Sequence, residues 1–88
     1  MTDVTLYNWI TVDGKDWGVH LWGELEEYED GTQQVVDIEA RYIYPSGEEV
    51  IVDDGVLNLP QEVADLASAL IDSPDTSDDM LKHGAIHR

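Results

Sequence analysis

Carboxylates and histidines are the side chains in this sequence that most invite a chemical role. The chain holds 20 Asp and Glu residues and 3 His but no Cys. His83 and His87 have the spacing that places two metal ligands on one helix face, but Gly84 lies between them and no third ligand stands out. The aspartates between residues 72 and 79 lack the alternating positions and the central Gly of a calcium loop. We therefore expect no metal site and no cofactor.

Catalytic motifs are also missing from the sequence. Twenty carboxylates in 88 residues guarantee chance pairs, so a pair such as Glu24 and Glu39 does not by itself indicate acid–base chemistry. There is no Gly-x-Ser-x-Gly nucleophile elbow, no glycine-rich phosphate loop and no Cys nucleophile, and His20 is as typical of a surface as of a general base. The sequence therefore predicts a non-enzymatic protein that binds another macromolecule.

The net charge narrows the class of partner. Against the 20 acidic residues stand only Lys15, Arg41, Lys82 and Arg88, which gives a formal charge of -16. Such a surface repels nucleic acid and anionic membranes and attracts basic proteins. We expect a basic protein as partner, with no direct binding of nucleic acid or membrane. The N-terminal residues show no signal-peptide pattern and no apolar run is long enough to span a membrane, so the predicted location is cytoplasmic.

Length and composition predict one small folded unit. The chain has 42% hydrophobic residues, including 3 Trp and 4 Tyr, which is enough apolar mass for a single core. The absence of Cys excludes a disulfide framework and favours a reducing compartment. We interpret residues 1–88 as a single domain, with a core in residues 1–72 and a tail in residues 73–88.

Alternating hydrophobicity predicts four strands in the first half of the chain. Residues 4–12 alternate as a half-buried strand, and Asp13 and Gly14 supply a tight turn before a second run that groups Trp17, Val19 and Leu21. A third run is predicted to place Val36, Ile38, Ala40, Tyr42 and Tyr44 on one face and Val35, Asp37, Glu39, Arg41 and Ile43 on the other. Residues 44–47 form the next turn, and a short fourth strand follows around residues 49–52.

The second half of the chain changes to a helical period. Asn58 is the predicted N-cap of a helix whose apolar stripe includes Val63, Leu66 and Leu70, and Ser73 followed by Pro74 ends it. Thr76 or Ser77 caps one more short turn that Gly84 ends, and residues 85–88 are expected to fray. The predicted fold is α+β: a four-stranded antiparallel meander with one C-terminal amphipathic helix packed on one face, plus a short terminal helical turn.

The face of the sheet that this helix leaves open is the predicted binding surface. Same-face residues lie about 6.7 Å apart along a strand and about 5 Å apart across strands, so carboxylates there form a lattice that imitates a phosphate backbone. Neighbouring aromatic residues supply desolvated anchors. The predicted partner-binding residues are Tyr7, Trp9, Trp22, Glu24, Glu26, Glu27, Glu29, Asp30, Asp37, Glu39, Glu48, Glu49, Asp53 and Asp54. Three alternatives remain open: Trp9 and Trp22 as core residues, a homodimer face, and a merely solvated acidic turn at residues 24–30.

In size, acidity and predicted α+β form, the chain resembles the small DNA-mimic inhibitors of phages and mobile elements, which include anti-restriction and anti-CRISPR proteins. The carboxylates of residues 24–54 carry this resemblance. It implies an inhibitor that acts in the cytoplasm of a host cell on a nucleic-acid-binding effector complex. The residues that would occupy the Lys/Arg groove of such a target are Glu24, Glu26, Glu39, Glu48, Glu49, Asp53 and Asp54.

Two other functions fit the same composition. An immunity protein or antitoxin that neutralises a basic toxin would take its specificity from Tyr7, Trp9 and Trp22 rather than from charge. An acidic accessory protein adapted to high salt would also have few lysines, because external salt screens the repulsion between its carboxylates. Charge reversal should cripple a polyanion mimic, whereas removal of Trp9 or Trp22 should cripple an aromatic-anchored immunity protein.

Overall fold

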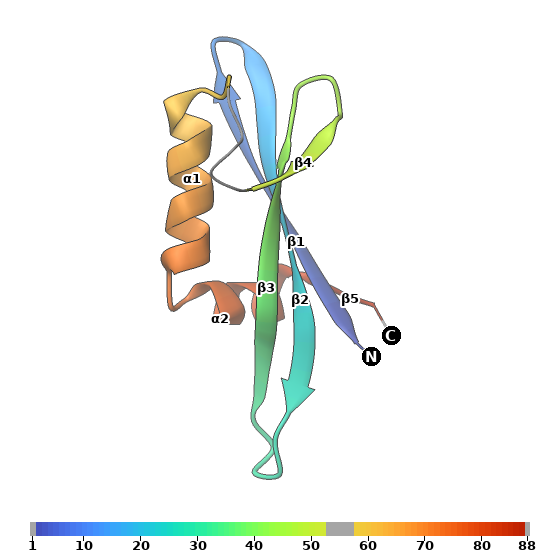
Figure 1. Cartoon of the computed structure of the whole chain (residues 1–88). Helices are drawn as coiled ribbons and strands as arrows, with labels where there is room; N and C mark the ends of the chain where they lie inside the picture. The colour runs from blue at the N-terminus through green and yellow to red at the C-terminus, as the bar shows by residue number, and fades with distance from the viewer. Residues whose placement is uncertain (1, 53–57, 88) are drawn as a thin grey trace.

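The structure is a computed structural model that describes residues 2–52 and 58–87. It is an α+β fold in which two helices cover one face of a five-stranded antiparallel sheet (Figure 1). The strands are β1 (Asp3–Val12), β2 (Lys15–Glu27), β3 (Gln33–Ile43), β4 (Glu49–Ile51) and β5 (Ala85–His87), and the helices are α1 (Gln61–Asp72) and α2 (Thr76–His83). The strands lie side by side in the order β4-β3-β2-β1-β5. The molecule is elongated, with extents of 46 × 22 × 20 Å.

The first hairpin follows the sequence prediction. Val12 pairs with Lys15 across a two-residue loop in which Asp13 and Gly14 both have positive φ, 51° and 76°. Loops of this type match the right-handed twist of the strands that they join. The register opposes Leu6 to Leu21, so the apolar residues of both strands share the face that the helices cover.

A β-bulge in β3 changes which of its residues are buried. Trp22 opposes Glu39 and Glu24 opposes Val36, so Asp37 and Ile38 together stand opposite the single residue Gly23. Asp37 takes a φ of 54°, the left-handed region that Asp enters more readily than most residues. The extra residue reverses the alternation before it, and Val35 is only 2% exposed. The predicted grouping of Val35 with Asp37 and Glu39 is therefore wrong.

The turn after β3 forms as predicted. Tyr44 donates its backbone N–H to the Glu48 carbonyl at 2.9 Å, and Gly47 adopts a φ of 93° inside the turn. The chain returns as β4, with Tyr42 opposite Val50. Tyr44 packs beside Trp17 at a centroid distance of 5.0 Å on the covered face.

Helix α1 begins later than the sequence predicts. Asn58 has a φ of 66°, and Pro60 is the N-cap residue, with no capping side chain. Pro60 disfavours helical geometry in the residue before it, and Pro60 itself has an extended ψ of 141°, so the helix begins at Gln61. The end of α1 is as expected, because Ser73 is extended before Pro74. Val63 and Ala67 of the predicted stripe are fully buried against the sheet.

Residues 73–87 form more structure than a terminal turn. Thr76 begins α2 rather than capping it, and its Oγ1 donates a hydrogen bond to the Leu70 carbonyl. Ser77 Oγ accepts the backbone N–H of Val35 at 2.9 Å, which fastens α2 to β3. Met80 is fully buried. The predicted short turn is thus a helix of 8 residues that closes one end of the core.

The last described residues form a strand instead of fraying. Ala85 to His87 pair antiparallel with Asp3 to Thr5 at the edge of the sheet. Gly84 makes this approach feasible, because a Cβ at that position would lie 2.7 Å from the Thr5 carbonyl oxygen. The sheet therefore has five strands rather than four, and the fold has two helices rather than one.

One polar side chain interrupts the covered face. Asn8 lies between Leu6 and Ile10 on β1, opposite Val19. Its Nδ2 group is buried and has no hydrogen-bond partner among the described residues. A buried donor without a partner costs about 1–3 kcal/mol, so this position lowers the stability of the core.

Candidate interaction surface

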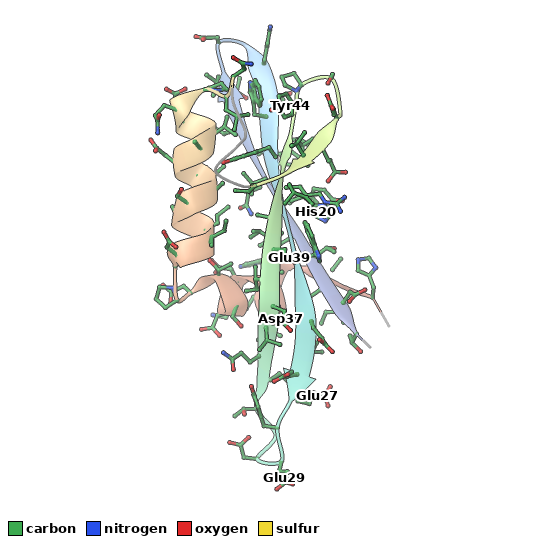
Figure 2. The ribbon with its side chains drawn as sticks, viewed as in Figure 1. His20, Glu27, Glu29, Asp37, Glu39 and Tyr44 are labelled. Atoms are coloured by element: carbon green, nitrogen blue, oxygen red, sulfur yellow. The ribbon has the colours of Figure 1, made fainter. Side chains whose placement is uncertain are left out.

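The face of the sheet opposite the helices carries the large exposed side chains of β1 and β4. Trp9 is 60% exposed, Ile51 57% and Tyr7 49%. Their alternation with the buried residues of the same strands turns them to this side, which we call the open face. Figure 2 shows His20, a residue of the same face, on the side of the sheet away from α1. Trp9 is therefore a surface residue, and the alternative of Trp9 as a core residue is wrong.

A row of stacked rings crosses the open face. It consists of Trp9, Tyr7, His20 and Trp22, and we call it the aromatic row. The centroids of Trp9 and Tyr7 are 6.3 Å apart with nearly parallel rings, and Tyr7 stacks on His20 at 4.2 Å. Trp22 follows at 5.6 Å from His20 in a tilted arrangement. The Arg41 guanidinium lies 4.8 Å from the Trp22 ring centroid and ends the row.

Strand register explains why these side chains meet. Tyr7 pairs with His20 across β1 and β2, and His20 pairs with Arg41 across β2 and β3. Trp9 pairs with Gly18, where a Cβ would lie 2.8 Å from the Trp9 ring, so the missing side chain leaves room for the indole. Cross-strand aromatic pairs each contribute roughly 0.2–1 kcal/mol, and the row is thus positioned by the sheet itself.

The centre of the row is held by a hydrogen bond. His20 Nδ1 lies 2.9 Å from Glu49 Oε1 of β4, and because a carboxylate only accepts, Nδ1 is the donor. The other ring nitrogen, Nε2, is buried and has no hydrogen-bond partner among the described residues. Glu49 thereby connects the edge strand β4 to the aromatic row.

Three predicted carboxylates lie on the open face beside the row. Glu39 opposes Trp22 directly, Glu24 lies two residues further along β2, and Glu26 follows opposite Gln34. Glu26 and Glu39 are exposed and Glu24 is half-buried. Together with Glu49, these groups border the aromatic row with negative charge, as the sequence predicts for this face.

A second acidic group lies at the tip of the β2–β3 hairpin, far along the long axis of the molecule (Figure 2). It comprises Glu27, Glu29 and Asp30, all exposed. The hydrogen bonds that Thr32 donates from its N–H and hydroxyl lower the pKa of Asp30. Tyr28 donates its hydroxyl to Glu26 at 3.1 Å, and this bond raises the pKa of the Tyr28 phenol. The tip does not join the aromatic row.

The remaining predicted residues are separated from both groups or lie outside the described residues. Asp37 is exposed in the bulge of β3, and Glu48 is exposed in the turn before β4. Asp53 and Asp54 lie outside the described residues. The structure thus divides the predicted site into an open-face group, a hairpin tip and two single positions.

The sequence-based site omitted three residues of the open face. His20 and Arg41 alternate with Trp22 and Glu39 on their strands, so the period of two already places them on this face, although neither is among the predicted partner-binding residues. Ile51 lies opposite Arg41 on β4 and is exposed, which only the strand pairing reveals. The open face therefore carries aromatic and acidic side chains together, and Arg41 and Ile51 add a cation and an exposed apolar group to it.

Neither a pocket nor a group of three or more metal-ligating side chains is formed by residues 2–52 and 58–87. Neither described helix is long and apolar enough to cross a membrane. No family model, curated protein or solved structure matches this chain. What the open face can bind therefore follows from its own geometry and charge.

Proposed function

We propose that this chain is a non-enzymatic inhibitor that occupies the basic, nucleic-acid-binding surface of another protein. The observation that carries the proposal is its charge per unit length. Of the 20 acidic and 4 Lys and Arg residues, the described stretches hold 18 and 3, since Asp53, Asp54 and Arg88 lie outside them, and the described charge is therefore -15. Over a length of 46 Å this is about one net charge per 3 Å.

That spacing falls within the range of nucleic acid. Duplex DNA carries one charge per about 1.7 Å of axis, and each of its strands one per about 3.4 Å. A basic groove that binds DNA through phosphates would meet a similar net charge per unit length on this molecule, summed over all of its faces. Such a groove would gain most from the carboxylates of the open face and the hairpin tip, which lie on β2, β3 and β4 and in the turn between β2 and β3.

The aromatic row supplies binding energy that the charge alone does not provide. Electrostatic attraction accelerates the encounter and orients the partners, but salt at 0.15 M screens it within about 8 Å. Trp and Tyr side chains that become buried in an interface contribute much of the binding energy. Trp9 and Tyr7 are exposed beside the carboxylates and are already held by their strands, so little conformational entropy is lost when a partner covers them.

The test is capture with competition by DNA. The immobilised chain is incubated with host-cell lysate at 0.15 M salt, bound proteins are identified by mass spectrometry, and duplex DNA is used for elution. We expect a nucleic-acid-binding protein that DNA displaces. Recovery of a partner that neither binds nucleic acid nor yields to DNA would refute the proposal.

Matched variants locate the binding charge. Glu24→Gln, Glu26→Gln and Glu39→Gln together remove three charges from the open face, and Glu62→Gln, Asp72→Asn and Asp79→Asn together remove three from exposed positions of the helices. We expect the first set to weaken binding of the captured partner and flatten its salt dependence more than the second. Equal losses would show that only the total charge matters and that the open face is not the binding surface.

A second candidate function is favoured by the exposure of the aromatic row. An immunity protein or antitoxin against one basic toxin would bind through Trp9 and Tyr7, with an affinity that survives moderate salt. Trp9→Ala would then abolish binding while the triple open-face substitution would be tolerated. The captured partner would also be indifferent to DNA.

A further inference from the structure

The outer edge of β1 is covered over only part of its length. β5 pairs with Asp3, Val4 and Thr5 and goes no further. Among the residues that the structure describes, no strand pairs with the outer edge of β1 from Leu6 to Val12. A strand edge of this kind can accept another strand through main-chain hydrogen bonds.

The register shows which backbone groups are available there. Leu25 donates its N–H to the Thr2 carbonyl at 2.9 Å, so the backbone polar groups of Thr2 point towards β2. In an antiparallel pair this orientation alternates along the strand. The even-numbered residues of β1 therefore bond to β2, and Tyr7, Trp9 and Thr11 direct their N–H and C=O groups outward.

The same three residues also turn their side chains to the open face, where all three are exposed. A strand added at this edge would therefore place alternate side chains directly beside Tyr7 and Trp9. The end of the edge has a net negative charge, because Asp13 lies in the turn and Asp16 accepts the Thr11 hydroxyl at 2.9 Å, against the single cation Lys15 opposite Val12. The outer edge of β1 thus offers a partner backbone groups for strand pairing, aromatic side chains for contact and a net negative charge.

We propose that an extended, basic segment of the partner pairs with the outer edge of β1 at Tyr7–Thr11 as an additional strand of the sheet. This rests on the proposed function, from which it takes the basic character of the partner. Alternate backbone groups of the segment bond to Tyr7, Trp9 and Thr11, and its Lys or Arg side chains lie over the open face. A second copy of the chain is not the favoured occupant, because each copy carries a formal charge of -16 and two copies repel each other.

The probe is an acetylated and amidated peptide of alternating lysine and valine residues, followed by NMR of the labelled protein. In the free protein the amides of Tyr7, Trp9 and Thr11 should exchange with solvent quickly and those of Asn8 and Ile10 slowly. The peptide should protect the first three and leave the other two unchanged. A peptide N-methylated at each lysine, the residues whose N–H groups would face Tyr7, Trp9 and Thr11, should give no protection.

A substitution in β1 can remove one outward N–H donor and leave the hydrogen bonds between β1 and β2 intact. The N–H of Thr11 points outward, so Thr11→Pro keeps the hydrogen bonds to β2 and deletes an edge donor. We expect the peptide to bind about tenfold more weakly. Thr11→Val is the matched control, because it loses the hydroxyl that binds Asp16 but keeps the N–H, and it should bind nearly as well as the parent chain.

Three results would overturn the inference. The first is that the peptide does not bind. The second is that it binds without protecting the Tyr7, Trp9 and Thr11 amides. The third is that protection rises with protein concentration in the absence of peptide, which would assign the edge to a second copy. Failure of the proposed function gives another result. DNA would then not displace the captured partner, while the peptide would still protect the Tyr7, Trp9 and Thr11 amides.

Discussion

Leu21 and Trp22 are neighbours in β2, yet they belong to two surfaces with different tasks. Leu21 is fully buried beneath the helices, whereas Trp22 lies on the open face between His20 and Arg41. The covered face is stabilised by apolar side chains of the sheet and of the helices that pack against each other. The open face holds its large side chains by ring stacking and one cation–π contact of about 0.5–1 kcal/mol, and leaves them accessible.

The difference between the faces shows where stability and binding separate in this molecule. A helix over the open face would have hidden Trp9 and Tyr7, and the net charge would then have had no aromatic anchor beside it. The apolar core lies on the covered face, and the side chains of the open face are available for contacts with another molecule. Substitutions on the covered face should therefore lower stability, and substitutions on the open face should lower the affinity for a partner.

The largest expected effect is the loss of a side chain from the covered face. Leu21→Ala removes a fully buried side chain and should lower the free energy of unfolding by about 2–5 kcal/mol. Trp9→Ala should lower it by less than about 1 kcal/mol, because most of the indole is already in water. Urea denaturation followed by circular dichroism measures both. Similar losses for the two variants would remove the distinction between the faces.

The same substitution at two glycines of β2 sharpens the contrast. A Cβ at Gly23 would lie 2.5 Å from Val35 Cγ1 and 2.9 Å from the Val36 carbonyl oxygen, so Gly23→Ala should cost about 1–3 kcal/mol of stability. A Cβ at Gly18 would meet chiefly the exposed Trp9 ring, which can move. Gly18→Ala should therefore cost less in thermal unfolding but displace Trp9, seen as a shift in tryptophan fluorescence.

Asn8 offers a way to improve the covered face. Asn8→Val removes the buried Nδ2 group that lacks a partner and places a β-branched side chain opposite Val19. We expect the free energy of unfolding to rise by about 1 kcal/mol. Asn8→Asp is the control, because it places a carboxylate in the same surroundings and should destabilise the protein. A loss of stability in Asn8→Val would mean that the amide is needed.

The smallest effect is expected where the open face meets the hairpin tip. Glu26 accepts the Tyr28 hydroxyl and raises the pKa of Tyr28, so Glu26→Gln should lower that pKa. Spectrophotometric titration of the tyrosinate band follows the change. Glu29→Gln, also in the acidic tip, is the control and should shift the Tyr28 titration less. The stability of Glu26→Gln at neutral pH should equal that of the parent chain, because both groups are exposed.

Much of the fold could be predicted because local rules agree with it. Asp13 and Gly14 specify a tight hairpin, Pro74 limits α1, and alternation assigns Leu6 and Leu21 to one face. Gly84 was expected to end a turn, but nothing in residues 85–87 indicates a strand on its own. Strand β5 exists because it pairs with β1, a contact between distant parts of the sequence that no local pattern contains.

The candidate site was less predictable for a related reason. The period of two placed Tyr7, Trp9 and Trp22 on one face correctly, but it failed at Asp37, where a bulge reverses the order of buried and exposed residues. Asp is common in ordinary turns and strand ends, so the residue type does not reveal a bulge. The hydrogen bond of His20 with Glu49 also depends on how β4 folds back beside β3.

The pairing of β5 with β1 has a consequence for folding kinetics. Thr5 Oγ1 and His87 Nε2 lie 3.0 Å apart although 82 positions separate the two residues in the chain. The hairpins of β1, β2 and β3 close short loops and can form early, whereas β5 must wait for a long loop to close. We expect β5 to dock last and to open first in the native state. Each such opening lengthens the free edge of β1 towards Asp3, so local unfolding and access to this edge are coupled.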